Sequence, residues 1–130
     1  MSPACASAPI RERAVELSGI RLCVRERGDG DPLLLINGIG AHLDMWASLE
    51  RALPQTRLIA FDAPGTGRSG TPFVPLGLES LAQLSERLLD RLDYDRVDVL
   101  GYSFGGLIAQ YLAHRAPERV RRLVLGVVTE

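Results

Sequence analysis

A serine between two glycines, at the junction of an apolar run and a helical segment, most limits what this chain can fold into. The run VDVL at 97–100 leads into Gly101-Tyr102-Ser103-Phe104-Gly105, and a helical segment follows at 107–116. Glycines two residues on either side of the serine, Gly101 and Gly105, permit a very tight turn. Such a turn lifts a hydroxyl clear of a sheet, where a base can reach it and backbone N–H groups can stabilise an oxyanion. Ser103 is therefore the candidate nucleophile; an incidental serine in a plain strand-to-helix turn is the alternative.

Strand-like and helical segments alternate along the rest of the chain. A hairpin with a Ser18-Gly19 turn is expected at 15–24, and short apolar runs typical of strands buried on both faces follow at 33–36, 58–61, 97–100 and 123–128. Helical periodicity at 42–53, 81–92 and 107–116 separates these runs. The pattern predicts an α/β fold, with an N-terminal hairpin, a mostly parallel sheet and helices on both of its faces. We expect a flexible tail at 1–13 and one domain at 14–130.

Composition limits the partners and the location of the protein. The chain has 15 basic residues, all of them arginine, and 16 acidic ones, so its net charge of −1 gives no field that favours nucleic acid. Arg119, Arg121 and Arg122 are interpreted as a solvated entrance to a strand. Cys5 and Cys23 have no zinc or disulfide spacing, which indicates a reducing compartment. With no signal peptide and no run of about 18 apolar residues, we expect a cytoplasmic protein with no membrane partner, metal or cofactor.

A second glycine-rich segment has the spacing of a dinucleotide-binding loop. Gly65-Thr66-Gly67-Arg68-Ser69-Gly70 follows a strand and has the pattern G-x-G-x-x-G. The next residues, Thr71-Pro72-Phe73-Val74-Pro75, cannot begin a helix that would bind a pyrophosphate. Nucleotide binding is therefore rejected.

Three motifs resemble those of the α/β-hydrolase superfamily: NGIGA at 37–41, FDAPGTGRSG at 61–70 and GYSFGG at 101–106. The first two are particularly similar to the intracellular poly(3-hydroxyalkanoate) depolymerase branch, whose members cleave polyester or oligoester through a serine triad. The resemblance implies an oxyanion hole made by the backbone N–H groups of Phe104 and Ile39.

Two further loop positions are assigned supporting roles. Most of the similar proteins carry His-Gly where this chain has Asn37-Gly38. An asparagine amide can also bond to loop backbone, so the departure is compatible with catalysis; a simple Asn-Gly turn is the alternative. Asp62 is interpreted as a scaffold carboxylate that accepts from backbone N–H groups of its own loop.

The other members of a serine triad are harder to place. In this fold an acid and then a histidine follow the serine. His114 lies 11 residues along the same helix, which at about 1.5 Å per residue is far outside hydrogen-bond reach. His42 precedes the serine, and Glu130 is the last residue; both stay open as minor candidates for base and acid. We therefore expect a fold truncated after about its sixth strand, without the acid, the histidine and the lid.

These observations lead to two hypotheses about function. The first is a serine hydrolase that acts on carboxylic esters through an acyl-enzyme on Ser103, with hydroxyalkanoate oligomers or polymer as the candidate substrate. Thioester hydrolysis, perhydrolysis and C–C bond hydrolysis are alternatives within the same fold. The second is a catalytically incomplete fragment or interaction module. We also expect poor ester turnover by the 130-residue chain, and self-association through an uncovered strand at 123–128.

Overall fold

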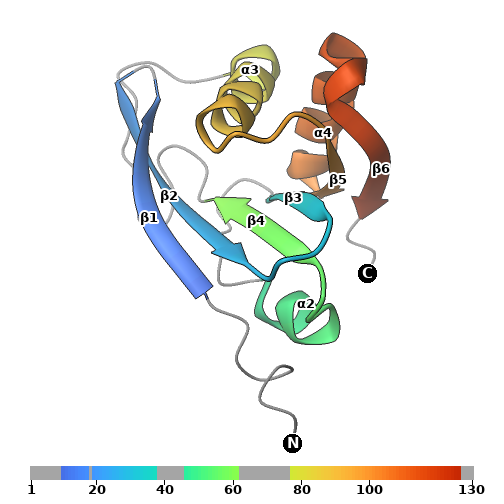
Figure 1. The fold of residues 1–130 in the computed structure, drawn as a ribbon. Coiled ribbons are helices and arrows are strands. Elements are labelled where there is room, and N and C mark those ends of the chain that lie inside the picture. Colours follow the sequence, from blue (N-terminus) through green and yellow to red (C-terminus); the bar gives the residue numbers. More distant parts are fainter. Residues whose placement is uncertain (1–9, 18, 38–45, 62–76, 127–130) are drawn as a thin grey trace, which may run out of the picture.

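The N-terminal hairpin and the parallel strands form one mixed sheet (Figure 1). The computed structural model describes residues 10–17, 19–37, 46–61 and 77–126. Within these residues the sheet has six strands in the order β1-β2-β4-β3-β5-β6. Their bounds are β1 Ile10–Leu17, β2 Ile20–Arg27, β3 Pro32–Ile36, β4 Arg57–Phe61, β5 Val97–Tyr102 and β6 Val120–Gly126.

The hairpin pairs β1 with β2 in antiparallel register from Ile10 opposite Arg27 to Leu17 opposite Ile20. The pairing therefore begins inside the segment that the sequence assigned to a tail at 1–13. Gly19 has a φ of +79°, which the two-residue turn requires and which glycine adopts without strain. β2 continues the antiparallel pairing on its other side, against β4.

The remaining strand pairs are parallel, as the unbroken apolar runs predicted. β3 lies between β4 and β5, and β6 pairs with β5 at the end of the sheet. Parallel neighbours require crossover connections. The chain therefore folds as an antiparallel hairpin followed by βαβ units, which confirms the predicted fold class.

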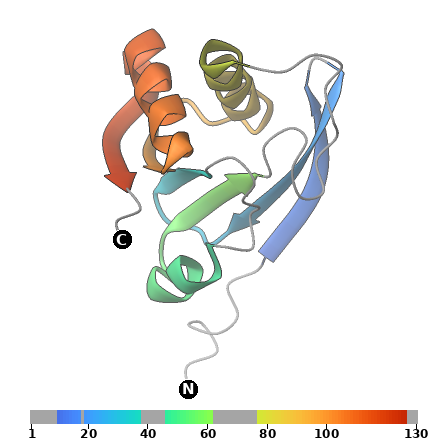
Figure 2. The ribbon, with the colours of Figure 1, turned by 180° about the vertical axis from the view of Figure 1, so that it is seen from behind.

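Helices cover both faces of the sheet (Figures 1 and 2). α3 (Leu78–Arg91) and α4 (Phe104–Arg115) pack together on one face, and α2 (Ala47–Ala52) lies on the other. A short 3₁₀ turn, η2 (Pro117–Arg119), joins α4 to β6. α2 is shorter than the helix expected at 42–53, of which residues 42–45 lie outside the described residues.

Two apolar cores follow from the alternation of side chains along each strand. On the α3 and α4 side, Leu34 and Ile36 of β3 pack with buried helix residues such as Leu88 and Leu112. On the α2 side, Leu35 of β3 packs in a second cluster, whose other buried residues are Trp46, Leu58 and Ala60. β3 is therefore covered on both faces, which is the reason its sequence is apolar without alternation.

The last strand begins earlier than the apolar run suggested. β6 starts at Val120 and includes Arg121 and Arg122, whereas the run predicted a strand at 123–128. Arg121 can lie in the strand because its guanidinium donates to both carboxylate oxygens of Asp98 on β5, at 3.0 and 2.9 Å. The predicted residues 127 and 128 lie outside the described residues.

Charged pairs also fix the turn before β6. Arg119 donates to the carbonyl oxygens of Asp95 and Tyr94 and pairs with Asp90 at 2.9 Å. The arginine cluster thus ties the end of α3 and the entry to β5 to the start of β6.

Among the helices of the described residues, none is long and apolar enough to cross a membrane.

Candidate active site at the β5–α4 turn

Ser103 lies on the turn between β5 and α4, directly before the first helical residue. Its backbone has φ 59° and ψ −123°, and its side chain is exposed. A non-glycine residue in this region of the φ/ψ map costs on the order of 1–3 kcal/mol and persists only where the surroundings impose it. Here the Ser103 N–H donates to the Gly126 carbonyl at 2.9 Å, and the Ser103 carbonyl accepts from the Gly106 N–H at 2.9 Å. The turn therefore has the strained, exposed serine that the glycine spacing predicted.

The two flanking glycines allow α4 to approach the sheet closely. A Cβ on Gly101 would lie 2.7 Å from the Ala109 Cβ, inside van der Waals contact. A Cβ on Gly105 would collide with the carbonyl of Ile36 and would lie 2.6 Å from the carbonyl of Asn37. The absence of both side chains lets the first turn of α4 rest against β5 and the end of β3.

This close approach brings Asn37 beside the serine turn. Asn37 directly follows β3, and its side chain is only 3% exposed. Its Oδ1 accepts a hydrogen bond from the indole Nε1–H of Trp46, and among the described residues its Nδ2 has no partner. Asn37 thus lies at the end of β3, next to the start of α4.

Phe104 is the first residue of α4, and its side chain packs partly buried against the larger core. The first N–H groups of a helix have no partner within the helix and carry its positive dipole end. The Phe104 N–H therefore has no partner within α4, and it directly follows Ser103 in the chain. The other proposed oxyanion donor, Ile39, and the supporting residues Gly38 and Asp62 lie outside the described residues.

Trp46 and Tyr102 are site neighbours that the sequence did not indicate as such. Their rings meet edge to face, with centroids 6.4 Å apart and an interplanar angle of 79°. Helical spacing assigned Trp46 to a core helix, and the residue is indeed buried, with 6% of its surface exposed. The signal that could have found it is chemical: an indole N–H that is buried needs an acceptor, and Asn37 is a nearby candidate in the sequence.

The comparisons with known proteins agree with this geometry. Residues 31–127 match the model of the alpha/beta hydrolase fold family. The chain belongs to this family. Among curated proteins, it is 48% identical over 118 residues to a poly(3-hydroxyalkanoate) depolymerase of Ectopseudomonas oleovorans, covering 88% of this chain and 42% of that protein. It is 38% identical to a 2-hydroxy-6-oxo-2,4-heptadienoate hydrolase of Pseudomonas putida, covering 87% and 43%.

A solved structure extends the comparison to three dimensions. A hydrolase from Pseudomonas aeruginosa superimposes with a TM-score of 0.84 at 38% identity, covering 88% of this chain and 45% of that one. The chain thus spans less than half the length of the relatives it matches.

Of the other three triad candidates, His114 alone lies among the described residues. His114 lies exposed in the last turn of α4, at the opposite end of the helix from Ser103. Eleven residues of helix separate the two by about 16 Å, so His114 is excluded as a base. His42 and Glu130 lie outside the described residues. Within the described part of the chain, no group of three or more His, Cys, Asp or Glu side chains could hold a metal ion.

Proposed function

We propose that the protein is a serine hydrolase that cleaves carboxylic esters, with Ser103 as the nucleophile. The observation that carries the proposal is the backbone of Ser103: a strained, exposed serine at the start of a helix whose first turn touches the end of β3. Structural turns have no need of a non-glycine residue at this φ/ψ, and strain of this kind is concentrated at functional sites.

In the proposed reaction, the Ser103 Oγ attacks the ester carbonyl carbon while its proton passes to a base. The tetrahedral intermediate carries an oxyanion, which the Phe104 and Ile39 N–H groups stabilise. Collapse breaks the bond to the alcohol, which leaves with the proton and gives an acyl-enzyme. Water then attacks the acyl carbon, releases the acid and restores the Ser103 hydroxyl. Among the described residues, His114 is too far from Ser103 to serve as that base.

For the substrate we propose a 3-hydroxyalkanoate polymer or oligomer. The sequence identity of 48% to a poly(3-hydroxyalkanoate) depolymerase supports this choice. The motif NGIGA, which begins at Asn37, supports it as well, because it is one of the two motifs that resemble this branch.

Hydrolysis of a C–C bond is the second candidate reaction, since a relative at 38% identity is a 2-hydroxy-6-oxo-2,4-heptadienoate hydrolase. A non-catalytic interaction module is the candidate from another class. It is favoured by the exposed apolar side chains that gather on α4 and β6.

The test uses a fluorophosphonate, in which a serine hydroxyl attacks phosphorus while the phosphoryl oxygen takes the place of the oxyanion, so an oxyanion hole alone accelerates labelling. We expect one phosphonate per chain on Ser103, at least tenfold faster than on the exposed Ser48 and Ser80, which serve as internal controls. Ser103→Ala should abolish this fast labelling. Equal labelling of the three serines would contradict the proposed nucleophile.

A second test addresses the substrate. Because we expect poor ester turnover by the 130-residue chain, an activated ester should leave its acyl group on Ser103, where mass spectrometry detects it. We expect a p-nitrophenyl 3-hydroxyalkanoate to acylate Ser103 faster than a p-nitrophenyl benzoate. The reverse order would contradict the polyester assignment. Rapid turnover lost in both Ser103→Ala and His42→Ala would identify His42 as the base.

A further inference from the structure

Trp46 contacts the two chain segments from which the proposed oxyanion donors come. Asn37 lies two residues before Ile39 in the sequence, and Tyr102 precedes Ser103 and Phe104. The Trp46 indole N–H is bonded to Asn37, and its ring meets the ring of Tyr102 edge to face. One buried side chain therefore joins the end of β3 to the end of β5 on the α2 side of the sheet.

The hydrogen bond also determines how the Asn37 amide is turned. An indole nitrogen only donates, so the Asn37 oxygen must face Trp46 and the NH₂ group must face away from it. The Nδ2 has no partner among the described residues although the side chain is buried. Its donors are thus turned away from Trp46, at the residue that directly follows β3.

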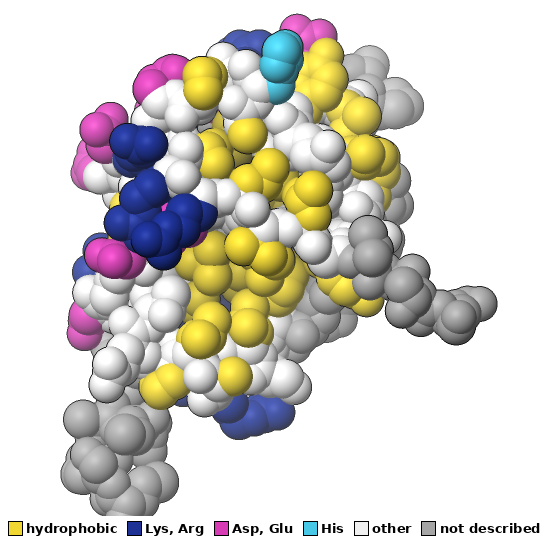
Figure 3. All heavy atoms as spheres, turned by 90° about the vertical axis from the view of Figure 1, so that its right-hand side faces the viewer, with side chains coloured by type: hydrophobic (Ala, Val, Ile, Leu, Met, Phe, Trp, Pro, Cys, Tyr) yellow, Lys and Arg dark blue, Asp and Glu magenta, His cyan; other side chains and the backbone are white. Residues whose placement is uncertain are grey.

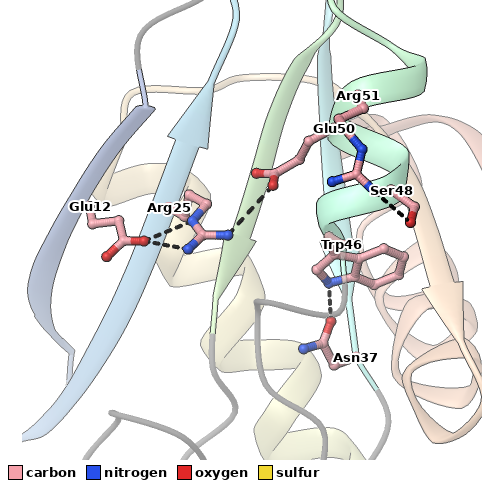
Figure 4. A network of polar contacts seen from close by, with 7 residues as sticks. All are labelled: Glu12, Arg25, Asn37, Trp46, Ser48, Glu50 and Arg51. Carbon is pink, nitrogen blue, oxygen red and sulfur yellow. Dashed lines mark hydrogen bonds and ion pairs between the residues drawn. The ribbon is translucent and has the colours of Figure 1, made fainter.

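α2, which carries Trp46 at its start, is itself held in place (Figure 4). Glu50 of α2 is buried and pairs with Arg25 of β2 at 3.5 Å. Arg25 in turn donates from Nε to Glu12 of β1 at 2.8 Å. Arg25 is only 14% exposed, so this pair is screened little by solvent. The helix cannot slide along the sheet without breaking a buried ion pair, and this restricts the indole.

We propose that Trp46 is a positioning residue that holds Asn37, at the end of β3, in place relative to Tyr102, at the end of β5, which leads into Ser103 and Phe104. This inference rests on the proposed function of Ser103. Loss of the indole N–H leaves the buried Asn37 oxygen without a donor among the described residues and removes the hydrogen bond between Asn37 and the start of α2. The effect falls on stabilisation of the oxyanion, which forms in the transition state, and leaves ground-state binding of the acyl group unchanged.

The experiment measures phosphonate labelling of Ser103 in the 130-residue chain at several probe concentrations. Trp46→Phe keeps an aromatic ring against Tyr102 and removes only the N–H donor. We expect the maximal labelling rate to fall about tenfold and the half-saturating probe concentration to stay within twofold. Leu53→Ala is the matched control, because Leu53 packs in the same cluster at the other end of α2. It should lower the melting temperature at least as much and leave the maximal labelling rate unchanged.

A spectroscopic readout separates this inference from the function on which it rests. Trp46 is the only tryptophan, so its indole N–H gives one assignable NMR resonance. The backbone amide resonances of Asn37 and Phe104 should move in Trp46→Phe and stay in place in Leu53→Ala. Equal effects of the two variants, on these resonances or on the labelling rate, would overturn the positioning role. Absence of selective labelling in the unaltered chain would overturn the proposed nucleophile, and the amide resonances alone would then decide the role of Trp46.

Discussion

Ser103 and the glycines around it occupy positions where one side-chain carbon changes the energy of the turn. The serine has a positive φ that only Asp93 shares among the described non-glycine residues. Gly101 and Gly105 lie where backbone and side-chain atoms of neighbouring elements fill the space of a Cβ. The local conformation is therefore imposed by packing between β3, β5 and α4, at a cost that the whole domain offsets.

Substitution of the serine itself should show this strain. Ser103→Gly removes the Cβ that disfavours φ 59°, whereas Ser103→Ala keeps it. Glycine also loses more backbone entropy on folding, which offsets part of the relieved strain. We therefore expect the free energy of unfolding of Ser103→Gly to be about 1 kcal/mol higher than that of Ser103→Ala. Urea denaturation of both variants measures the difference. A less stable glycine variant would show that the turn is not strained.

The stability of the chain should respond differently to alanine at the two adjacent glycines of α4. A Cβ on Gly105 collides with backbone of β3, which cannot move away, so Gly105→Ala should lower the free energy of unfolding by about 2–3 kcal/mol. The nearest atom to a Cβ on Gly106 is 3.5 Å away, an ordinary contact. Gly106→Ala should therefore be neutral or up to about 1 kcal/mol more stable, from helix propensity. Similar losses in both variants would contradict the close approach at Gly105.

At the scale of elements, the pairing of β5 with β6 is held by charge as well as by backbone. Asp98 on β5 accepts two hydrogen bonds from Arg121 on β6. The hydrogen bond from Arg121 is the main reason that the pKa of Asp98 lies below its usual value, and partial burial opposes it. Arg121 also lies 3.5 Å from Asp31, at the start of β3. The three strands are thus joined at the end opposite Ser103.

This pair predicts a dependence of stability on pH. A carboxylate whose pKa is lowered in the folded state binds fewer protons there than in the unfolded state, so stability rises with pH. The contribution of Asp98 is complete above the ordinary pKa of about 3.9 and is lost as pH falls through the lowered value. The melting temperature of Asp98→Asn should thus lie below that of the unaltered chain at pH 7 and approach it near pH 2. Glu118→Gln, on the exposed turn η2, is the control for the same change of charge. A gap that stays constant with pH would contradict the pairing.

For the molecule as a whole, apolar surface is concentrated on one side. Leu107 and Tyr111 of α4 and Leu123, Val124 and Leu125 of β6 are between 38% and 53% exposed. Figure 3 shows hydrophobic side chains across the face that carries these two elements. β6 pairs with β5 alone among the described strands, so its outer edge has unpaired backbone groups. An apolar edge of this kind is a template for a further strand.

We therefore expect the 130-residue chain to self-associate through β6. Sedimentation at low micromolar concentration should detect dimers or larger species that bind a hydrophobic dye. Val124→Lys places a charge at the most exposed apolar position of the edge and should shift the population to monomer. Ala52→Lys makes the same change of charge on α2 and should not. A dye-free monomer of the unaltered chain would contradict the prediction.

Much of the fold could be predicted from local patterns. Apolar runs indicated the parallel strands, helical periodicity indicated α3 and α4, and the spacing of Gly101, Ser103 and Gly105 indicated a turn with an exposed serine. These features depend on residues a few positions apart, because strand and helix periods repeat every 2 and 3.6 residues. The family followed from the same short motifs.

The tertiary structure decided what lies beside what. The order that places β3 between β4 and β5 brings Asn37 against Gly105, and the crossover that places α2 on the far face brings Trp46 between Asn37 and Tyr102. The start of β6 at Val120, and not at the apolar run, depends on Asp98 one strand away. No local pattern contains these neighbours, because the free energy of packing two layers of helices against one sheet determines which residues meet.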